Sequence, residues 1–318
     1  MPEEAASTAP TLTEEQIDHV LQALADGYGQ QARSPILHVP SERGLHYEEV
    51  TFPSADGVPL EGWYIPAPGS DRLVIANHPR GFSRSGMPSH LEPWKSVWGP
   101  SGNGFEVDFI SDYKILHDAG YNVLTYDLRN HGHSGAANGG IVSSGVFEYR
   151  DVLGSLTYAR ARKDTQNMTK GLFSRCLGSN ATIYAMTRDP RAFDGVRCLV
   201  APQPLTPQVI AEKLLALSGV PDGRIDDLDQ RVLLRTSINF AARDVRQWAK
   251  NVRVPTFLYQ VHDDVLTTPD DVQTIYDNIP VADKALHWIH DTTARWDGYV
   301  EFQRRPEPML QWFAKYMS

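Results

Sequence analysis

The sequence contains little cysteine and lacks a leader that would direct it out of the cell. Only two cysteines, Cys176 and Cys198, occur among its 318 residues. Residues 1–10 include neither the basic segment nor the apolar segment of a secretory signal. Cysteines in a chain of this kind are normally reduced, so free thiols are favoured over a disulfide between the two. These absences predict a cytoplasmic protein.

Long apolar runs and clusters of positive charge are also missing. No stretch approaches the roughly 20 apolar residues that a membrane-spanning helix needs, so we expect no membrane association. The formal net charge is −9, and lysine and arginine are not gathered in any one segment. Because a surface that binds nucleic acid needs such a basic patch, a nucleic-acid partner is not expected.

The usual signatures of bound metals and cofactors are absent as well. The histidines are scattered and lack the spacing of zinc ligands. Neither a glycine-rich phosphate loop nor a dinucleotide-binding fingerprint is present. We therefore predict no metal site and no cofactor, and the sequence carries no signal of the oligomeric state.

What the chain does contain is a regular alternation of short apolar runs and helical patterns. Such alternation predicts an α/β fold, with a mainly parallel sheet and helices on both of its faces. We expect strands at 46–52, 59–65, 73–77, 121–126, 168–173, 196–200, 255–260 and 286–289, and helices at about 107–119, 147–162, 269–278 and 308–317.

Three stretches do not fit the alternation. A capping pattern at Thr13 starts a helix in an N-terminal helical appendage, residues 1–45. The rest, 46–318, is predicted to form one α/β domain. Within it, 82–104 is long enough to be a binding loop, and about 206–251 holds helices between consecutive strands, which predicts an inserted lid.

The clearest chemical signal is the run Ser174-Arg-Cys-Leu-Gly178, directly after a strand and before a helix. A nucleophile on a strained turn of this kind needs small residues two positions before and after it. The start of a helix favours a thiolate, and Arg175 adds to this effect if its side chain turns inward. We interpret Cys176 as a reactive thiol and Cys198, within an apolar run, as a core residue.

At these residues the sequence resembles the α/β-hydrolase superfamily, over nearly the whole chain from about 46 to 317. The run His78-Pro-Arg-Gly81 stands where that family places its oxyanion-hole loop, and 126–135 resembles its D-x-R-x-H-G-x-S segment. The stretch 254–264 resembles the strand and loop that deliver the acidic residue. A cysteine as nucleophile is the minority arrangement, similar to that of dienelactone hydrolases.

The resemblance implies roles for several further residues. Asp264 is the preferred acidic residue and Asp263 the runner-up, because Asp264 directly precedes the short apolar stretch Val265-Leu266. The oxyanion hole is expected to use the backbone N–H of Leu177 and one from the His78 loop. That second group is assigned to Arg80, since Pro79 has no N–H.

The family's histidine is missing, because the expected position holds Ala294. Four explanations remain open. His290 reaches in as the base, and it is our candidate; or another histidine, such as His78, His131 or His133, lines the pocket. Alternatively, an ionised thiol needs no base, or alanine replaces an original histidine by engineering.

The leading functional hypothesis is a cysteine-dependent hydrolase or acyl-transfer enzyme for a small carbonyl substrate, either an ester, a lactone or a thioester. We expect His78, Trp94 and Trp98 to contact that substrate. The lid aromatics Phe240 and Trp248 either line the same pocket or pack within the lid. The alternatives are a non-hydrolytic lyase, isomerase or cyclase, or a catalytically inactive ligand-binding protein, because fold alone does not decide function.

Overall fold

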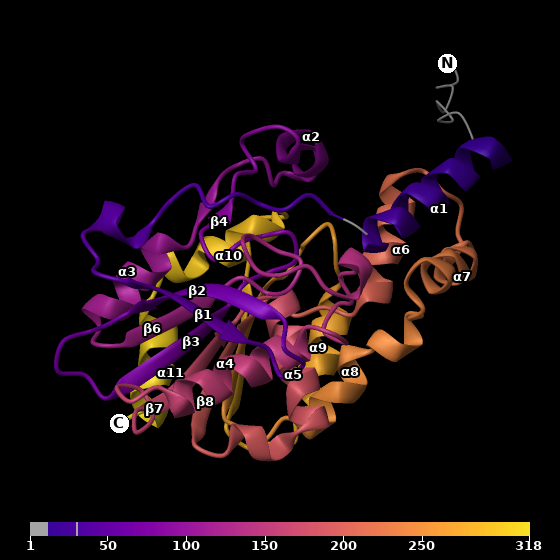
Figure 1. Ribbon diagram of the computed structural model, residues 1–318. Helices are drawn as coiled ribbons and strands as arrows, with labels where there is room; N and C mark the ends of the chain where they lie inside the picture. Colours follow the sequence, from indigo (N-terminus) through magenta and orange to yellow (C-terminus); the bar gives the residue numbers. More distant parts are fainter. Residues whose placement is uncertain (1–11, 30) are drawn as a thin grey trace, which may run out of the picture.

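An eight-stranded sheet forms the centre of the molecule (Figure 1). The computed structural model describes residues 12–29 and 31–318. The prediction about a secretory signal concerns residues 1–10, which lie outside the described residues. The strand order is β1-β2-β6-β3-β7-β8-β9-β10. The strands are β1 (Glu48–Pro53), β2 (Pro59–Ile65), β3 (Arg72–Asn77), β6 (Asn122–Tyr126), β7 (Thr169–Ser174), β8 (Val196–Pro202), β9 (Thr256–Val261) and β10 (Lys284–Ile289).

The sheet is mainly parallel, which confirms the predicted architecture. Strand β2 runs antiparallel to both β1 and β6, and every pairing from β6 to β10 is parallel. The central strands are buried along nearly their whole length because helices cover both of their faces. All six residues of β9 are buried.

Helices pack against both faces of the sheet. Helices α4, α5, α8 and α9 cover one face, and α3, α10 and α11 cover the other. No helix in the described part of the chain combines the length and the apolar character needed to cross a membrane. The helices are α1 (Glu14–Gly29), α2 (Trp94–Trp98), α3 (Ile110–Asp118), α4 (Tyr149–Ala161), α5 (Leu177–Arg188), α6 (Pro207–Leu217), α7 (Ile225–Thr236), α8 (Val245–Trp248), α9 (Pro269–Asn278), α10 (Arg295–Arg304) and α11 (Glu307–Tyr316).

The helix expected at 107–119 is shorter than predicted. Its first residues form a strand, β5 (Val107–Asp108), which pairs with β4 (Gly86–Met87). The helix begins at Ile110 because the Asp108 side chain accepts a hydrogen bond from the Ile110 N–H at 2.8 Å. No pattern in the sequence predicts α10, although this helix carries part of the candidate site.

Helix α1 packs with two later helices into a group that has its own apolar core. Thr13 and Gln16 form the expected capping box. Apolar residues of α1, α6 and α7 share one core that is separate from those on the two faces of the sheet, and Figure 1 shows the three helices together at one end of the molecule. We call α1, α6 and α7 the cap. Helix α8, within the predicted lid at 206–251, packs instead against the sheet side of the molecule.

Candidate active site

Cys176 occupies a strained turn between β7 and α5. Its φ and ψ angles are 47° and −108°, in a region that residues other than glycine rarely adopt. Two backbone hydrogen bonds hold it there: its N–H donates to the Pro202 carbonyl, and its carbonyl accepts from the Asn180 N–H, each at 2.9 Å. The turn therefore presents the sulfur at the start of α5 in one fixed direction.

The small residues on either side of Cys176 are needed for close packing. A Cβ added to Gly178 would lie 2.6 Å from the Cβ of Asn77, a distance that real Cβ atoms do not reach. Ser174, on the other side, accepts a hydrogen bond from the Asn77 amide at 2.8 Å. The spacing found in the sequence thus reflects how tightly the turn packs against the end of β3.

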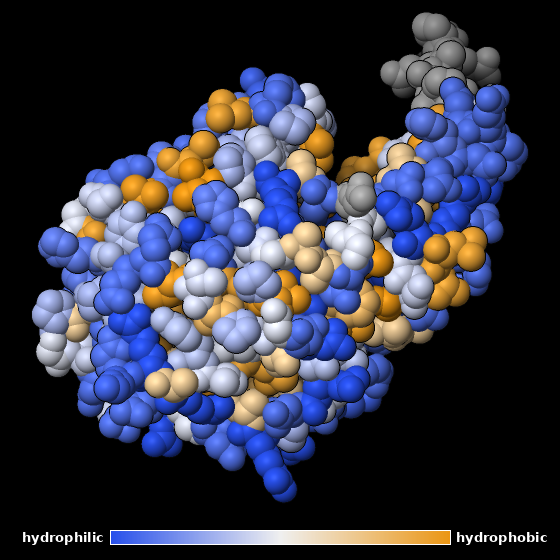
Figure 2. All heavy atoms as spheres, in the orientation of Figure 1, coloured by the Kyte–Doolittle hydropathy of each residue, from blue (hydrophilic) through white to orange (hydrophobic). Residues whose placement is uncertain are grey.

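Cys176 lies at the inner end of a cleft of about 410 Å³. Figure 2 shows the hollow between α2 and the cap, with hydrophobic residues on its inner walls. Its walls come from α1, α2, α5, α6 and α10, and they are largely apolar. Among the lining residues are Leu24, Trp94, Trp98, Leu205, Ile210 and Leu214.

The buried carboxylate of Asp264 is bound to an arginine. Asp264 follows β9 and is 4 % exposed. Its Oδ2 accepts a hydrogen bond from Nη1 of Arg295 at 2.6 Å and another from the Thr267 hydroxyl at 3.1 Å. Its Oδ1 accepts from the Leu266 N–H at 2.9 Å. Asp263, the runner-up from the sequence, is exposed and bonded to a neighbouring histidine.

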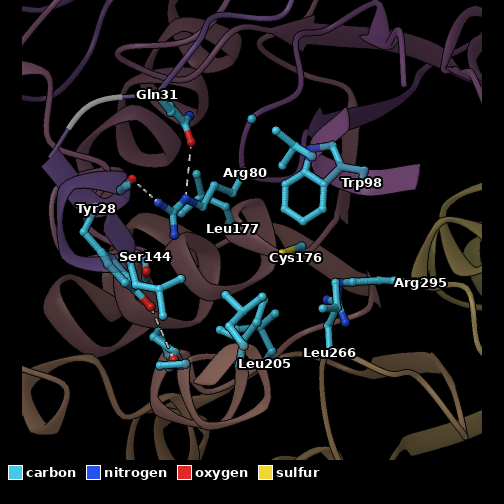
Figure 3. A pocket seen from close by; sticks show the side chains of 18 of the residues that line it. Tyr28, Gln31, Arg80, Trp98, Ser144, Cys176, Leu177, Leu205, Leu266 and Arg295 are labelled. Atoms are coloured by element: carbon cyan, nitrogen blue, oxygen red, sulfur yellow. Dashed lines mark hydrogen bonds between the residues drawn. The ribbon is translucent and has the colours of Figure 1, made fainter. Parts of the chain in front are cut away.

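Arg295 is the first residue of α10, directly after Ala294, and it is buried beside Cys176. Its Nε donates to the Tyr299 hydroxyl at 3.1 Å, and its Nη2 donates to the Gln203 carbonyl. Burial alone would lower the pKa of this guanidinium, but Tyr299, Asp264 and Cys176 together raise it above its usual value. Arg295 is therefore a fixed positive charge next to the thiol (Figure 3).

Tyr299 stands one helical turn after Arg295 and also borders the cleft. Burial raises the pKa of its phenol well above the usual value; the Arg295 charge opposes that rise, and the adjacent Cys176 sulfur adds to it. The phenol therefore keeps its proton at neutral pH. Because the Tyr299 oxygen accepts a hydrogen bond from Arg295, the hydroxyl hydrogen is available for a hydrogen bond to the Cys176 sulfur.

Two histidines assigned to the site from the sequence lie elsewhere. His290, the candidate base, is exposed and packs against the ring of His262 at a centroid distance of 5.0 Å. His78, expected to contact the substrate, is buried. Its Nε2 accepts from the Leu128 N–H at 2.9 Å, and its Nδ1 bonds the Pro79 carbonyl at 2.7 Å. Burial lowers the pKa of His78 to about 4, so it is a neutral structural residue.

The other histidines considered as bases do not reach the cleft either. His131 is buried, with Nδ1 2.8 Å from the Arg129 carbonyl and Nε2 2.6 Å from the Gln31 amide nitrogen. Burial lowers its pKa to about 3, and His133 is exposed. All eleven histidines fall within the described residues, and no histidine, aspartate, glutamate or lysine of that part lines the cleft.

The two backbone N–H groups expected to form the oxyanion hole are free. Leu177 and Arg80 both line the cleft beside Cys176. Within residues 12–29 and 31–318, neither N–H donates a hydrogen bond to a protein acceptor. The Arg80 side chain turns away, since its guanidinium donates to the Gly27 carbonyl at 2.6 Å and to the Gln31 side chain at 3.2 Å. Figure 3 shows Arg80 and Arg295 on opposite sides of Cys176.

The aromatic residues proposed from the sequence divide into two groups. Trp94 and Trp98 line the cleft, and Trp98 packs against Trp296 at 5.1 Å. Phe240 is buried within the cap, and Trp248 packs with α8 against the sheet side, so neither belongs to the cleft wall.

The Arg175 side chain does not turn toward the thiol. It is fully buried and pairs with Asp112. Its guanidinium also lies over the rings of Phe109 and Phe173 at 4.3 and 3.8 Å. The condition for a contribution from Arg175, a side chain turned toward the thiol, is therefore not met, and the positive charge beside Cys176 belongs to Arg295.

Solved structures of several enzymes share this architecture. The Pyrococcus furiosus esterase Pf2001 is 19% identical, with a TM-score of 0.66, and the match covers 91% of this chain and 100% of that one. The α/β hydrolase GrgF from Penicillium sp. sh18 (15% identical, TM-score 0.58) and the dienelactone hydrolase from Anabaena variabilis (15%, 0.51) each match over 86% of this chain and 99% of their own. No family model and no curated protein matches. The chain has the α/β-hydrolase fold, as predicted.

Proposed function

We propose that this α/β-hydrolase-fold protein is a cysteine-dependent acyl-transfer enzyme or hydrolase, acting on a small ester, lactone or thioester. The observation that supports this most is the placement of Cys176. It sits on a strained turn at the start of a helix, at the inner end of an apolar cleft, beside two free backbone N–H groups. This combination is typical of a site that attacks a carbonyl.

In the proposed first step, the Cys176 sulfur attacks the carbonyl carbon and the C=O electrons move to oxygen. The Leu177 and Arg80 N–H groups donate hydrogen bonds to that oxyanion. When the tetrahedral intermediate collapses, the leaving group departs and an acyl-cysteine remains. A second nucleophile then takes the acyl group and releases the sulfur.

Arg295 supports this chemistry in place of a histidine. A serine would need a base to remove its proton, whereas a positive charge beside a thiol stabilises the thiolate that attacks. Arg295 cannot accept a proton, so it stabilises the attacking thiolate and does not act as a base. Asp264 holds the guanidinium in position at 2.6 Å.

The test is intact-mass analysis after brief exposure to 4-nitrophenyl octanoate and, separately, to iodoacetamide near neutral pH. We expect single-site modification at Cys176 and loss of nitrophenol release in Cys176→Ala. Cys198→Ala is the matched control, because burial in β8 raises the pKa of Cys198 to about 12 and leaves it unreactive. An unmodified Cys176 would refute the covalent mechanism.

A second candidate function is non-hydrolytic chemistry on a carbonyl compound, by a lyase, isomerase or cyclase. The lack of any histidine or carboxylate on the described cleft wall favours it, because such reactions must avoid activating water. Turnover of a dicarbonyl compound without ester cleavage would support this alternative. A purely ligand-binding protein would bind equally well with Cys176→Ala and show no reactive thiol.

A further inference from the structure

We propose that the acyl donor of this site is a thioester with an apolar acyl group, and that the acyl-cysteine persists until an ionised nucleophile other than water removes it. This inference rests on the proposed function and names its substrate class. The geometry that carries it is the set of groups around the Cys176 sulfur.

The groups next to the sulfur hold protons and do not exchange them readily. Arg295 is held by Asp264, Tyr299 and Gln203, and Tyr299 is fully buried beneath it. Both keep their protons at neutral pH. They therefore stabilise a negative charge on sulfur, and the described wall of the cleft carries no histidine, lysine or carboxyl group that would exchange protons with incoming or departing groups.

Asp264 is not available as a base. Its two oxygens accept hydrogen bonds from Leu266, Thr267, Gln260 and Arg295, and the side chain is buried. It does not line the cleft. A carboxylate with this many donors has its oxygens occupied within the protein and is shielded from the substrate.

The absence of proton transfer selects the leaving group. When Cys176 forms its bond to the acyl carbon, the bond that breaks releases its electron pair to the leaving atom. A thiolate departs unprotonated, because thiols ionise near pKa about 8.5. An alkoxide is far more basic and needs a proton that this site does not supply. The exchange balances without a net proton, because the Cys176 thiolate and the thioester substrate give the acyl-cysteine and the thiolate of the leaving group.

The same argument applies to the second half of the reaction. Water attacking the acyl-cysteine must lose a proton, and general-base catalysis normally contributes about 10²–10⁴-fold to such a step. Without it, hydrolysis is slow. A nucleophile that arrives already ionised, such as a thiolate, needs no base and regenerates the Cys176 thiolate directly.

The walls of the cleft indicate the kind of acyl group. Leu205, Trp98, Ile210 of α6 and Trp94 of α2 line the cleft together with Cys176. The charged groups on its described wall are both arginines: Arg295 is paired with Asp264, and Arg80 donates hydrogen bonds to the Gly27 carbonyl and the Gln31 side chain. A volume of about 410 Å³ with such walls suits an aliphatic or aromatic chain rather than a charged one.

The experiment compares two donors that differ in one atom, S-ethyl thiooctanoate and ethyl octanoate. Formation of the octanoyl adduct on Cys176 is followed by intact mass, with free 2-mercaptoethanol as the reference for uncatalysed reactivity. We expect the enzyme to react with the thioester and to leave the oxygen ester unchanged. The octanoyl adduct should persist in buffer and be discharged by added 2-mercaptoethanol.

The possible outcomes separate this inference from the proposed function. General-acid catalysis contributes about 10²–10⁴-fold to the departure of an alkoxide, so we expect a rate difference of that order between the two donors. If ethyl octanoate acylates Cys176 within about tenfold of the thioester rate, the proposed selection of the leaving group is wrong. Rapid loss of the adduct in buffer alone overturns the persistence of the acyl-enzyme. In both cases the cysteine mechanism stands. If neither donor nor 4-nitrophenyl octanoate forms an adduct on Cys176, the proposed function itself is wrong.

Chain length tests the acyl class. Burial of each methylene should raise the acylation rate constant kcat/KM by about fourfold, the equivalent of 0.8 kcal/mol, so octanoyl should exceed acetyl strongly. Trp98→Ala should weaken this preference. Leu234→Ala, which changes an exposed residue of α7 away from the cleft, is the control and should leave the preference as it is. Equal rates for acetyl and octanoyl donors would exclude an apolar-chain substrate.

Discussion

The Asp264 carboxylate binds Arg295, at 2.6 Å, where an α/β hydrolase with a complete triad would have its acid bound to a histidine. The two residues are buried, and the arginine borders the same cleft as Cys176. In the proposed mechanism, Asp264 therefore holds an arginine rather than a base. Electrostatic stabilisation of a thiolate would then replace proton transfer as the means of activating the nucleophile.

Replacing Arg295 should slow the reaction of Cys176 with iodoacetamide. With Arg295→Gln we expect at least a tenfold lower rate at neutral pH, equivalent to about 1.4 kcal/mol, and a shift of the alkylation profile to higher pH. Arg295→Lys keeps the positive charge, so its alkylation rate should lie between that of the unmodified protein and that of Arg295→Gln. The measurement is the alkylation rate of each folded variant across a pH series.

A control is needed because Arg295→Gln also leaves Asp264 buried without its partner, which costs about 3–5 kcal/mol. Arg129 forms a comparable buried pair with Asp151 at 2.7 Å, away from the cleft. Arg129→Gln should lose similar stability without moving the alkylation profile. If both variants move it alike, the effect of Arg295 is structural only.

The buried His78 should make the protein less stable in mild acid. Burial lowers the pKa of His78 from 6.5 to about 4, so the unfolded chain binds this proton more readily. The stability contribution is complete above pH 6.5 and is lost as the pH falls toward 4. It amounts to about 3 kcal/mol for this residue. Urea unfolding midpoints between these pH values measure it.

Buried carboxylates act in the opposite direction over part of this range. Burial raises the pKa of Asp112 to about 6 and that of Asp151 to about 7, so acid favours the fold at those two positions. The His78 effect is therefore isolated by comparing the protein with His78→Asn, whose stability should change less between pH 6.5 and 4. Identical pH slopes would contradict a neutral, buried His78.

Loosening the cap should affect substrate binding more than global stability. Leu21 of α1 is fully buried in the separate core of the cap. Leu21→Ala should destabilise that core by about 2–5 kcal/mol and raise KM, while the main thermal transition of the sheet changes little. Glu15→Ala, on the exposed side of α1, is the control. Loss of the main transition would show that the cap and sheet unfold together.

Two glycines in helices should respond oppositely to alanine. Gly178→Ala places a Cβ 2.6 Å from that of Asn77, and overpacking of this kind costs about 1–3 kcal/mol. It should also reduce Cys176 alkylation, because the turn must shift. Gly27→Ala, with nothing within 4 Å of the added Cβ, should be neutral or stabilising by about 0.5–1 kcal/mol. Thermal unfolding of both variants tests this contrast.

The sequence predicts the sheet and the turn at Cys176 because both depend on local patterns. Apolar runs mark the buried strands, and β2 is predicted with its observed bounds, Pro59–Ile65. The small residues around Cys176 identify the turn, since nothing larger than Gly178 fits against Asn77.

The basic partner of Asp264 does not follow from local pattern. Helix α10 opens with Arg295-Trp296 and contains Gly298, so it lacks a clear amphipathic repeat and is missed. Residue type makes His78 and His290 candidates for the site, but the burial of His78 and the exposure of His290 are tertiary properties. One signal in the sequence points to these residues. Arg295 directly follows Ala294, and Tyr299 stands four residues later, a spacing that places both side chains on one face of a helix.

The place of α1 in the cap has a consequence for synthesis of the chain. Asp18 of α1 pairs with Arg231 of α7 across 213 positions of sequence. At translation rates of about 5–20 residues per second, these partners emerge on the order of tens of seconds apart. The apolar face of α1 stays uncovered during that time, so this helix is among the last elements to reach its native contacts. The speed of translation through α6 and α7 then determines how long the apolar face of α1 is exposed to chaperones.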